Sequence, residues 1–230
     1  MIQNLRDLGG IRTSDGAEIS HGKLIRSAYL IEAEEDDLAG ISKVIDLRTP
    51  EEVREKPDKT YGVTYLHQPV FDGRVKGISQ ESRNRWVGAP NMSEIYAGIV
   101  DHHSESFRTT LKTIMEHDFS SGAVLWHCSE GKDRCGLTTA MVLELLGVPR
   151  GIIMEDYLKT NVINLEKAYR ISEKVRAERG DEFADNVYKA IIADQSYLEA
   201  AWEVMGENYY RDRLGIEDEE IMEFRRTILQ

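Results

Sequence analysis

A cysteine and an arginine, Cys128 and Arg134, stand six positions apart in a segment that also holds a histidine, a lysine and two carboxylates. As a thiolate, cysteine is a strong nucleophile, and arginine presents a planar fork of N–H donors that matches the oxygens of a phosphate. Within one loop, this spacing would bring a nucleophile and an anion clamp to the same point. The segment therefore predicts nucleophilic chemistry on a bound anion.

The elements on either side of this segment would hold it in place. Residues 123–126 are an apolar run of buried-strand length, and residues 136–146 carry apolar side chains at helical spacing before Gly147. A strand-to-helix turn directs successive backbone N–H groups and the positive end of the helix at one spot, which binds anions and stabilises a thiolate. Gly131 permits a backbone conformation that a side chain would obstruct.

The loop and four further blocks resemble the bacterial tyrosine-and-lipid phosphatase family of cysteine-dependent phosphatases. Within the loop, the order Gly131-Lys132-Asp133-Arg134 is similar to that family's. The other similar blocks are residues 4–10, 22–28, 45–52 and 156–158. The resemblance implies hydrolysis of phosphomonoesters through a cysteinyl-phosphate, with no metal and no organic cofactor. The implied substrates carry phosphotyrosine, and sometimes phosphoserine, phosphothreonine or a phosphoinositide.

The resemblance also assigns roles within the loop. Cys128 would be the nucleophile and Arg134 the phosphate clamp. The remaining loop residues would surround the phosphate; they are Ser129, Glu130, Gly131, Lys132 and Asp133. Lys132 would either bind a second phosphate on an inositol ring or support the substrate phosphate itself.

Two aspartates compete for the role of general acid, which protonates the leaving oxygen. Asp133 is favoured in families with this type of loop. Asp72 is the rival, because it follows a predicted strand in a stretch that reads as a loop, and Asp46 is a further alternative.

Three residues near the loop are auxiliary candidates. Asp46 and Arg48 belong to the similar block at 45–52 and would reach the site, although Arg48 could instead pair with Glu51 or Glu52. His127 would orient the loop backbone.

The chain departs from the family at Cys135, where relatives usually carry threonine or serine. A thiol donates hydrogen bonds more weakly than a hydroxyl, which predicts slower breakdown of the intermediate. Oxidation would join Cys128 and Cys135 in a disulfide. The alternative is that Cys135 is only a small buried residue near the start of the helix.

The fold class that this pattern predicts is α/β, with a central, mostly parallel sheet flanked by helices and a helical C-terminal third. Strands are expected at residues 43–48, 63–70 and 123–126. Helices are expected at 93–102, 104–117, 136–146, 152–161, 165–178, 182–192, 195–205 and 218–228. Residues 1–230 would form a single domain, in which the helical segment at about 160–206 would form a lid or simply pack.

Composition narrows the class of partner and the compartment. The chain has 230 residues, with 29 basic and 41 acidic side chains and a formal charge of −12. This acidic surplus argues against nucleic acid and against stable membrane association. Two cysteines and no recognisable signal peptide favour the cytoplasm, although secretion without such a peptide stays open. Expected partners are phosphorylated peptides, small phosphomonoesters or phosphoinositides; the oligomeric state is not predicted.

Three other readings compete with a phosphatase. The block at residues 44–52 also resembles a segment of rhodanese-type sulfurtransferases, although the residues Gly131 to Asp133 argue against that chemistry. A nucleotide-binding P-loop would need glycine in place of Trp126 and serine or threonine in place of Asp133. An inactive phosphate-binding module would have lost the cysteine or the arginine, and both are present.

Overall fold

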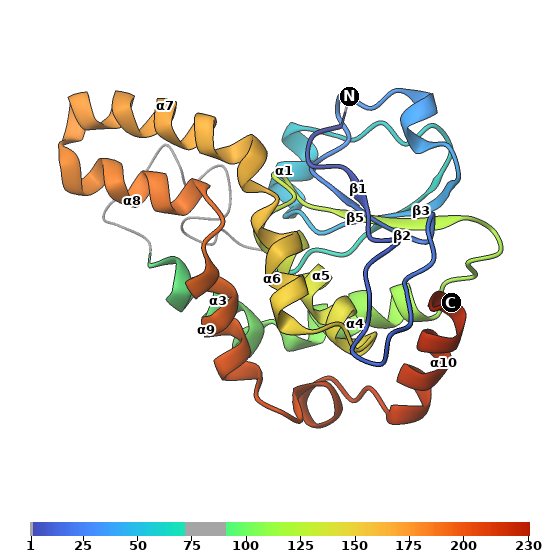
Figure 1. Ribbon diagram of the computed structural model, residues 1–230. Helices are drawn as coiled ribbons and strands as arrows, with labels where there is room; N and C mark the ends of the chain where they lie inside the picture. The colour runs from blue at the N-terminus through green and yellow to red at the C-terminus, as the bar shows by residue number, and fades with distance from the viewer. Residues whose placement is uncertain (1, 72–90) are drawn as a thin grey trace.

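A five-stranded sheet forms the centre of the computed structural model, which describes residues 2–71 and 91–230 (Figure 1). The strands are β1 (Arg6–Asp7), β2 (Leu24–Ser27), β3 (Ile41–Asp46), β4 (Thr64–His67) and β5 (Ala123–His127). They lie in the order β1-β2-β5-β3-β4, with β1 antiparallel to β2 and the other pairs parallel. The predicted α/β class with a mostly parallel sheet is confirmed.

Side chains of the central strands alternate between two apolar layers, as the pleat of a strand requires. On β5, Leu125 packs into a small cluster on one face, whereas Val124 and Trp126 pack into the main core on the other. On β3, Val44 and Ile45 divide in the same way. Because both faces are covered, β5 carries a continuous apolar run at residues 123–126, which is typical of parallel sheets.

Helices cover both faces of the sheet. In Figure 1, α4, α5 and α10 lie on the side of the main core, and η1 lies on the opposite side. The helices are η1 (Glu35–Leu38), α1 (Pro50–Glu55), α3 (Met92–His102), α4 (Ser104–Met115), α5 (Asp133–Leu145), α6 (Arg150–Leu158), α7 (Asn161–Arg179), α8 (Asp181–Ile191), α9 (Gln195–Met205), the π-helical η2 (Tyr209–Arg213) and α10 (Asp218–Ile228).

Each helix predicted from apolar spacing is present, and α9 and α10 have the predicted bounds. Helix α5 begins at Asp133, three residues before the predicted start, because the N–H of Gly136 already donates to the carbonyl of Lys132 at 2.7 Å. Two loop residues thereby enter its first turn. Strand β2 escaped prediction because the buried Arg26 interrupts its apolar pattern.

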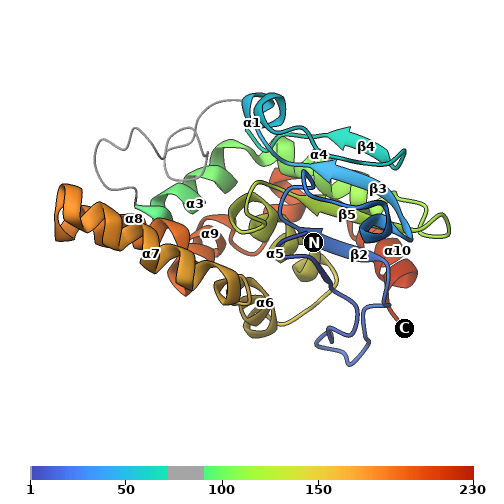
Figure 2. The same cartoon turned by 90° about the horizontal axis from the view of Figure 1, so that it is seen from above.

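Helices α7 and α8 form a hairpin that extends away from the sheet (Figure 2). Gly180 joins them with a φ of 86°, in the left-handed region that glycine adopts readily. Within residues 2–71 and 91–230, every helix is too short or too polar to span a bilayer.

Candidate active site

The loop of residues 128–132 lies at the carboxyl edge of the sheet, between β5 and α5. At the end of β5, His127 is in register with Ser27 of β2 on one side and Asp46 of β3 on the other. In open α/β sheets, ligands bind in the crevice outside the carboxyl ends of the strands. The segment predicted to do chemistry therefore occupies the place where such folds bind ligands.

Two side chains from the N-terminal part of the chain, Asn4 and Arg26, hold carbonyl groups of the loop. Asn4 Nδ2 donates to the carbonyls of Glu130 and Gly131 at 3.1 and 2.9 Å, and Arg26 Nη2 donates to the carbonyl of Gly131 at 2.7 Å. In a trans peptide, the N–H group that follows a carbonyl points the opposite way, which is the arrangement that an anion cradle requires. Gly131 has a φ of 65°, and an added Cβ would lie 2.7 Å from the carbonyl oxygen of Ser27.

A buried carboxylate on α6, that of Asp156, orients Arg26, which holds the loop. Asp156 accepts from Arg6 Nε at 2.7 Å and from Arg26 Nη1 at 2.6 Å. Burial alone would raise the pKa of Asp156, but the two guanidinium groups lower it. These contacts tie the similar blocks at residues 4–10, 22–28 and 156–158 to the loop.

Arg134 lies in the first turn of α5 and is almost fully buried. It forms a two-pronged ion pair with Glu52 of α1, with Nη1–Oε2 at 2.5 Å and Nη2–Oε1 at 2.9 Å. The hydroxyl of Ser129 donates to the same carboxylate at 2.6 Å. Among the described residues, the buried Nε of Arg134 has no hydrogen-bond partner. Glu52 therefore orients the guanidinium and leaves it a donor for an anion.

Glu52 also caps its own helix. Its backbone N–H donates to the Thr49 hydroxyl at 3.2 Å, and its carboxylate accepts from the N–H of Thr49 at 2.9 Å, which forms a capping box. Burial alone would raise the pKa of Glu52, but Arg134 and Ser129 lower it to about 2. One carboxylate thus fixes both α1 and the guanidinium.

Glu52 should make stability depend on pH. Its pKa lies below its ordinary value of 4.5, so its ionised form stabilises the fold above that value, and this contribution is lost as pH falls toward 2. We expect the difference in unfolding free energy between wild type and Glu52→Gln to shrink by about 2 kcal/mol from about pH 7 to about pH 3. Urea unfolding at both pH values measures it, and an unchanged difference would contradict the ion pair.

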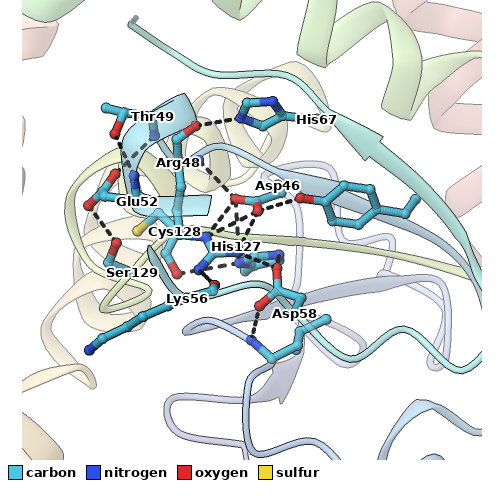
Figure 3. Close-up of polar contacts among 12 residues, drawn as sticks. Asp46, Arg48, Thr49, Glu52, Lys56, Asp58, His67, His127, Cys128 and Ser129 are labelled. Atoms are coloured by element: carbon cyan, nitrogen blue, oxygen red, sulfur yellow. Dashed lines mark hydrogen bonds and ion pairs between the residues drawn. The ribbon is translucent and has the colours of Figure 1, made fainter. Parts of the chain in front are cut away.

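Behind the loop, His127 belongs to a buried polar cluster (Figure 3). Its Nε2 lies 3.2 Å from Asp58 Oδ2, and its Nδ1 lies 3.9 Å from Asp46 Oδ1. Arg48 Nη2 joins the two carboxylates at 2.7 and 2.5 Å, and the Tyr65 hydroxyl donates to Asp46 at 2.7 Å. Burial opposes a charge on His127, but the two carboxylates outweigh it and raise the pKa of the imidazole.

This cluster shows which carboxylates Arg48 contacts. The predicted alternative was a pairing of Arg48 with Glu51 or Glu52. For Glu52 it is wrong, because the Glu52 carboxylate faces Arg134 while Arg48 joins Asp46 and Asp58. By their donor atoms, Asp46, Asp58 and His127 could together hold a metal ion. The guanidinium of Arg48 already supplies the positive charge between the two carboxylates, so these residues fit a structural ion-pair network better than a metal centre.

Asp133 opens α5 and is buried. Its Oδ1 accepts from the Tyr96 hydroxyl of α3 at 2.7 Å and lies 3.1 Å from Lys132 Nζ. The Lys132 ammonium also donates to the carbonyls of Ala190 and Ile192 at the end of α8, at 2.6 and 3.1 Å. Lys132 therefore links the loop to the α7–α8 hairpin.

A second contact joins the loop to this hairpin. Lys167 of α7 lies 2.6 Å from the Glu130 carboxylate. A carboxylate beside an anion site would repel the ligand, and this ion pair reduces that repulsion.

Both cysteines are free and buried. The Cys135 Sγ lies 3.7 Å from the carbonyl oxygen of Trp126, to which its thiol can donate. Burial raises the pKa of Cys135 to about 11, so it stays protonated at neutral pH. Cys135 is thus buried near the start of α5, as its simpler reading predicts.

Several known proteins have sequences similar to that of this chain. The sequence model of the tyrosine phosphatase family matches residues 1–230. The chain belongs to this family. A protein of Cupriavidus necator, which is named as a tyrosine-protein phosphatase, is 28% identical over 176 residues, or 72% of this chain and 63% of that protein.

Two further relatives are also named as phosphatases. A tyrosine-protein phosphatase of Nostoc commune is 31% identical over 135 residues, 56% of this chain and 44% of that protein. The triple specificity protein phosphatase PtpB of Mycobacterium tuberculosis is 38% identical over 95 residues, 37% of this chain and 34% of that protein. The matches thus span from about a third to less than two thirds of these relatives' own lengths.

The structure brings the predicted loop residues together at one edge of the sheet. Asp46, Arg48 and His127 lie directly behind them. Asp72 lies outside the described residues. Sequence reasoning missed four residues that hold the site: Glu52, Asp58, Tyr96 and Asp156. For Glu52, the spacing of Thr49 and Glu52 is typical of a capping box and could have pointed to this residue. No local pattern points to Tyr96 or Asp58.

Proposed function

We propose that this protein hydrolyses phosphomonoesters, phosphotyrosine first among them, through a covalent intermediate on Cys128. The observation that carries the proposal is the buried guanidinium of Arg134, which Glu52 holds at 2.5 and 2.9 Å beside the cysteine loop while its Nε keeps no partner among the described residues. An oriented arginine with a spare donor fits the oxygens of a phosphate better than the sulfur species of a sulfurtransferase.

In the first step, the Cys128 thiolate attacks phosphorus and the bond between phosphorus and the leaving oxygen breaks. The loop N–H groups and Arg134 stabilise the charge on the three other oxygens. Asp133 donates a proton to the leaving oxygen. The products of this step are the free alcohol or phenol and a cysteinyl-phosphate.

In the second step, water attacks the phosphorus of the intermediate and the sulfur leaves as a thiolate. The Asp133 carboxylate takes a proton from that water, so the acid is restored together with free phosphate. Asp133 is proposed as the acid because it lies in the loop and is held by Tyr96 and Lys132.

Two features favour phosphotyrosine over phosphoinositides. The Lys132 ammonium already binds the carbonyls of Ala190 and Ile192, so a second phosphate would have to displace these contacts. The formal charge of −12 also opposes encounter with polyanionic ligands. Phosphoserine and phosphothreonine stay alternative substrates, as the resemblance of the loop to the phosphatase family implies.

A substrate panel tests this order. We expect kcat/KM to be highest for a phosphotyrosine peptide, lower for a phosphoserine peptide, and lowest for a phosphoinositide in micelles, where added salt raises it. A phosphoinositide rate above the phosphotyrosine rate would overturn the preference. Thiosulfate-to-cyanide transfer without phosphatase activity would instead support the sulfurtransferase alternative, and phosphate binding without turnover would support an inactive module.

The second cysteine extends the proposal to redox chemistry. Peroxide would oxidise the Cys128 thiolate to a sulfenic acid, and attack by the Cys135 sulfur would then release water and form a disulfide. Because the pKa of Cys135 is raised to about 11, we expect this closure to be faster at alkaline pH. Mass spectrometry after mild peroxide should find an internal bridge that thiols reverse; over-oxidised Cys128 alone would contradict it.

The domain organisation and the compartment are part of the same proposal. We expect residues 1–230 to act as one phosphatase domain, with the α7–α8 hairpin held against the loop by Lys132 and Glu130. The cytoplasm stays a prediction.

A further inference from the structure

A chain of two buried tyrosine hydroxyls ends on Asp133. The Tyr96 hydroxyl donates to Asp133 Oδ1 at 2.7 Å, and the Tyr96 and Tyr157 hydroxyl oxygens lie 2.8 Å apart. The two tyrosines come from α3 and α6, and both are at most 1% exposed. Buried hydrogen bonds to a carboxylate are among the strongest that proteins make, so this chain fixes where the carboxylate points.

The surrounding packing leaves these rings little freedom. The Tyr96 and Tyr157 rings meet edge to face with centroids 6.3 Å apart, and the Tyr197 ring of α9 lies 5.6 Å from that of Tyr96. Gly136, one turn after Asp133, lets the Tyr157 ring approach α5, since an added Cβ there would lie 3.0 Å from it. Three helices and the glycine therefore place one hydroxyl against one carboxylate oxygen.

The two carboxylate oxygens of Asp133 differ in their hydrogen-bond partners. Both Tyr96 and Lys132 contact Oδ1, and within the described part of the chain Oδ2 has no hydrogen-bond partner. A carboxyl group whose one oxygen accepts a fixed hydrogen bond carries its proton on the other. This division leaves Oδ2 as the atom that would exchange a proton with the leaving oxygen and with water.

We propose that Tyr96, supported by Tyr157, is a positioning residue that holds Asp133 as the general acid with Oδ2 toward the substrate. The inference rests on the proposed phosphatase function and names the residue that makes its acid step effective. Tyr96 itself touches neither substrate nor the reacting atoms. Removing the Tyr96 hydroxyl should therefore slow hydrolysis most for substrates whose leaving group needs a proton.

The test compares Tyr96→Phe with wild type on two substrates. p-Nitrophenyl phosphate has a leaving group that departs without an acid, whereas phosphoserine has one that needs a proton. We expect kcat/KM of Tyr96→Phe to fall about 10- to 100-fold on a phosphoserine peptide and by less than about 3-fold on p-nitrophenyl phosphate. Tyr157→Phe should show a smaller loss with the same dependence on the leaving group, which keeps the test usable if Tyr96→Phe folds poorly.

Two controls separate positioning from damage to the fold. Tyr197→Phe removes a hydroxyl from the same ring cluster, but that hydroxyl donates to the carbonyl of Lys189 at 2.8 Å, so both rates should stay near wild type. In an Asp133→Asn background, Tyr96→Phe should have little further effect on the phosphoserine rate.

Each outcome has a distinct meaning. Equal losses on both substrates would show a structural role and overturn the positioning role, while the phosphatase function would stand. An undiminished phosphoserine rate in Tyr96→Phe would also overturn it. Wild-type protein without turnover on either substrate would overturn the proposed function, and the inference with it.

Discussion

Cys128→Ser is expected to lower kcat/KM on every phosphomonoester by about 10⁴-fold or more. A serine hydroxyl at the same place lacks the ready ionisation and the nucleophilicity of a thiol. The loop backbone would be little disturbed, because Asn4 and Arg26 hold the carbonyls of Glu130 and Gly131. The substitution should therefore lower the rate of the chemical step, while the protein still binds phosphate.

The chain supplies a matched control for this substitution. Cys135→Ser exchanges the other buried cysteine, which takes no part in the proposed attack on phosphorus. We expect it to keep wild-type activity within about 10-fold, because a hydroxyl can replace the weak donor. Steady-state rates and thermal melting of both variants check the prediction. A Cys128→Ser variant that turns over at the wild-type rate would exclude Cys128 as the nucleophile.

Arg134→Lys is the second change with a large expected effect. Lysine keeps the positive charge but loses the planar fork that pairs with both oxygens of Glu52 and retains a donor for the substrate. Removing one fixed donor from a developing charge costs about 10²- to 10³-fold in rate. We expect a loss of at least this size, mainly in kcat.

Stability provides a second readout for Arg134→Lys. Glu52 is buried and its pKa is held at about 2, so a poorer partner leaves a carboxylate incompletely paired. A fall of about 2 kcal/mol in the free energy of unfolding at neutral pH is expected, and it should vanish when Glu52 is replaced by glutamine as well. Unchanged kcat in a folded Arg134→Lys variant would contradict the assigned clamp.

Much of the fold could be read from local pattern. The run at residues 123–126 and the helical spacing after Gly136 place the loop between strand and helix, because burial on both faces leaves a purely apolar strand. The edge of the sheet was harder to predict. Strand β2 contains Arg26, whose partners Asp156 and Gly131 lie more than a hundred positions away, so no local signal explains a buried arginine there.

The candidate site is also only partly predictable from local sequence. Cys128, Asp133 and Arg134 could be predicted because one loop carries them all. The residues that orient them come from other elements, Glu52 from α1 and Tyr96 from α3, and only the packing of those helices brings them to the loop. Arg48 shows the limit of reasoning from neighbours, because one of its two carboxylate partners, Asp58, is ten positions away rather than on the adjacent helix turn.

The central claim is a phosphate bound covalently to Cys128, and a rapid-quench experiment tests it most directly. Wild-type protein in excess is mixed with p-nitrophenyl phosphate, denatured within the first turnover, digested and analysed by mass spectrometry. We predict a phosphate on the peptide that contains Cys128, present also in Cys135→Ser and absent in Cys128→Ser. Release of p-nitrophenol at the full rate with no phosphate on Cys128, or with phosphate on another residue, would contradict the account.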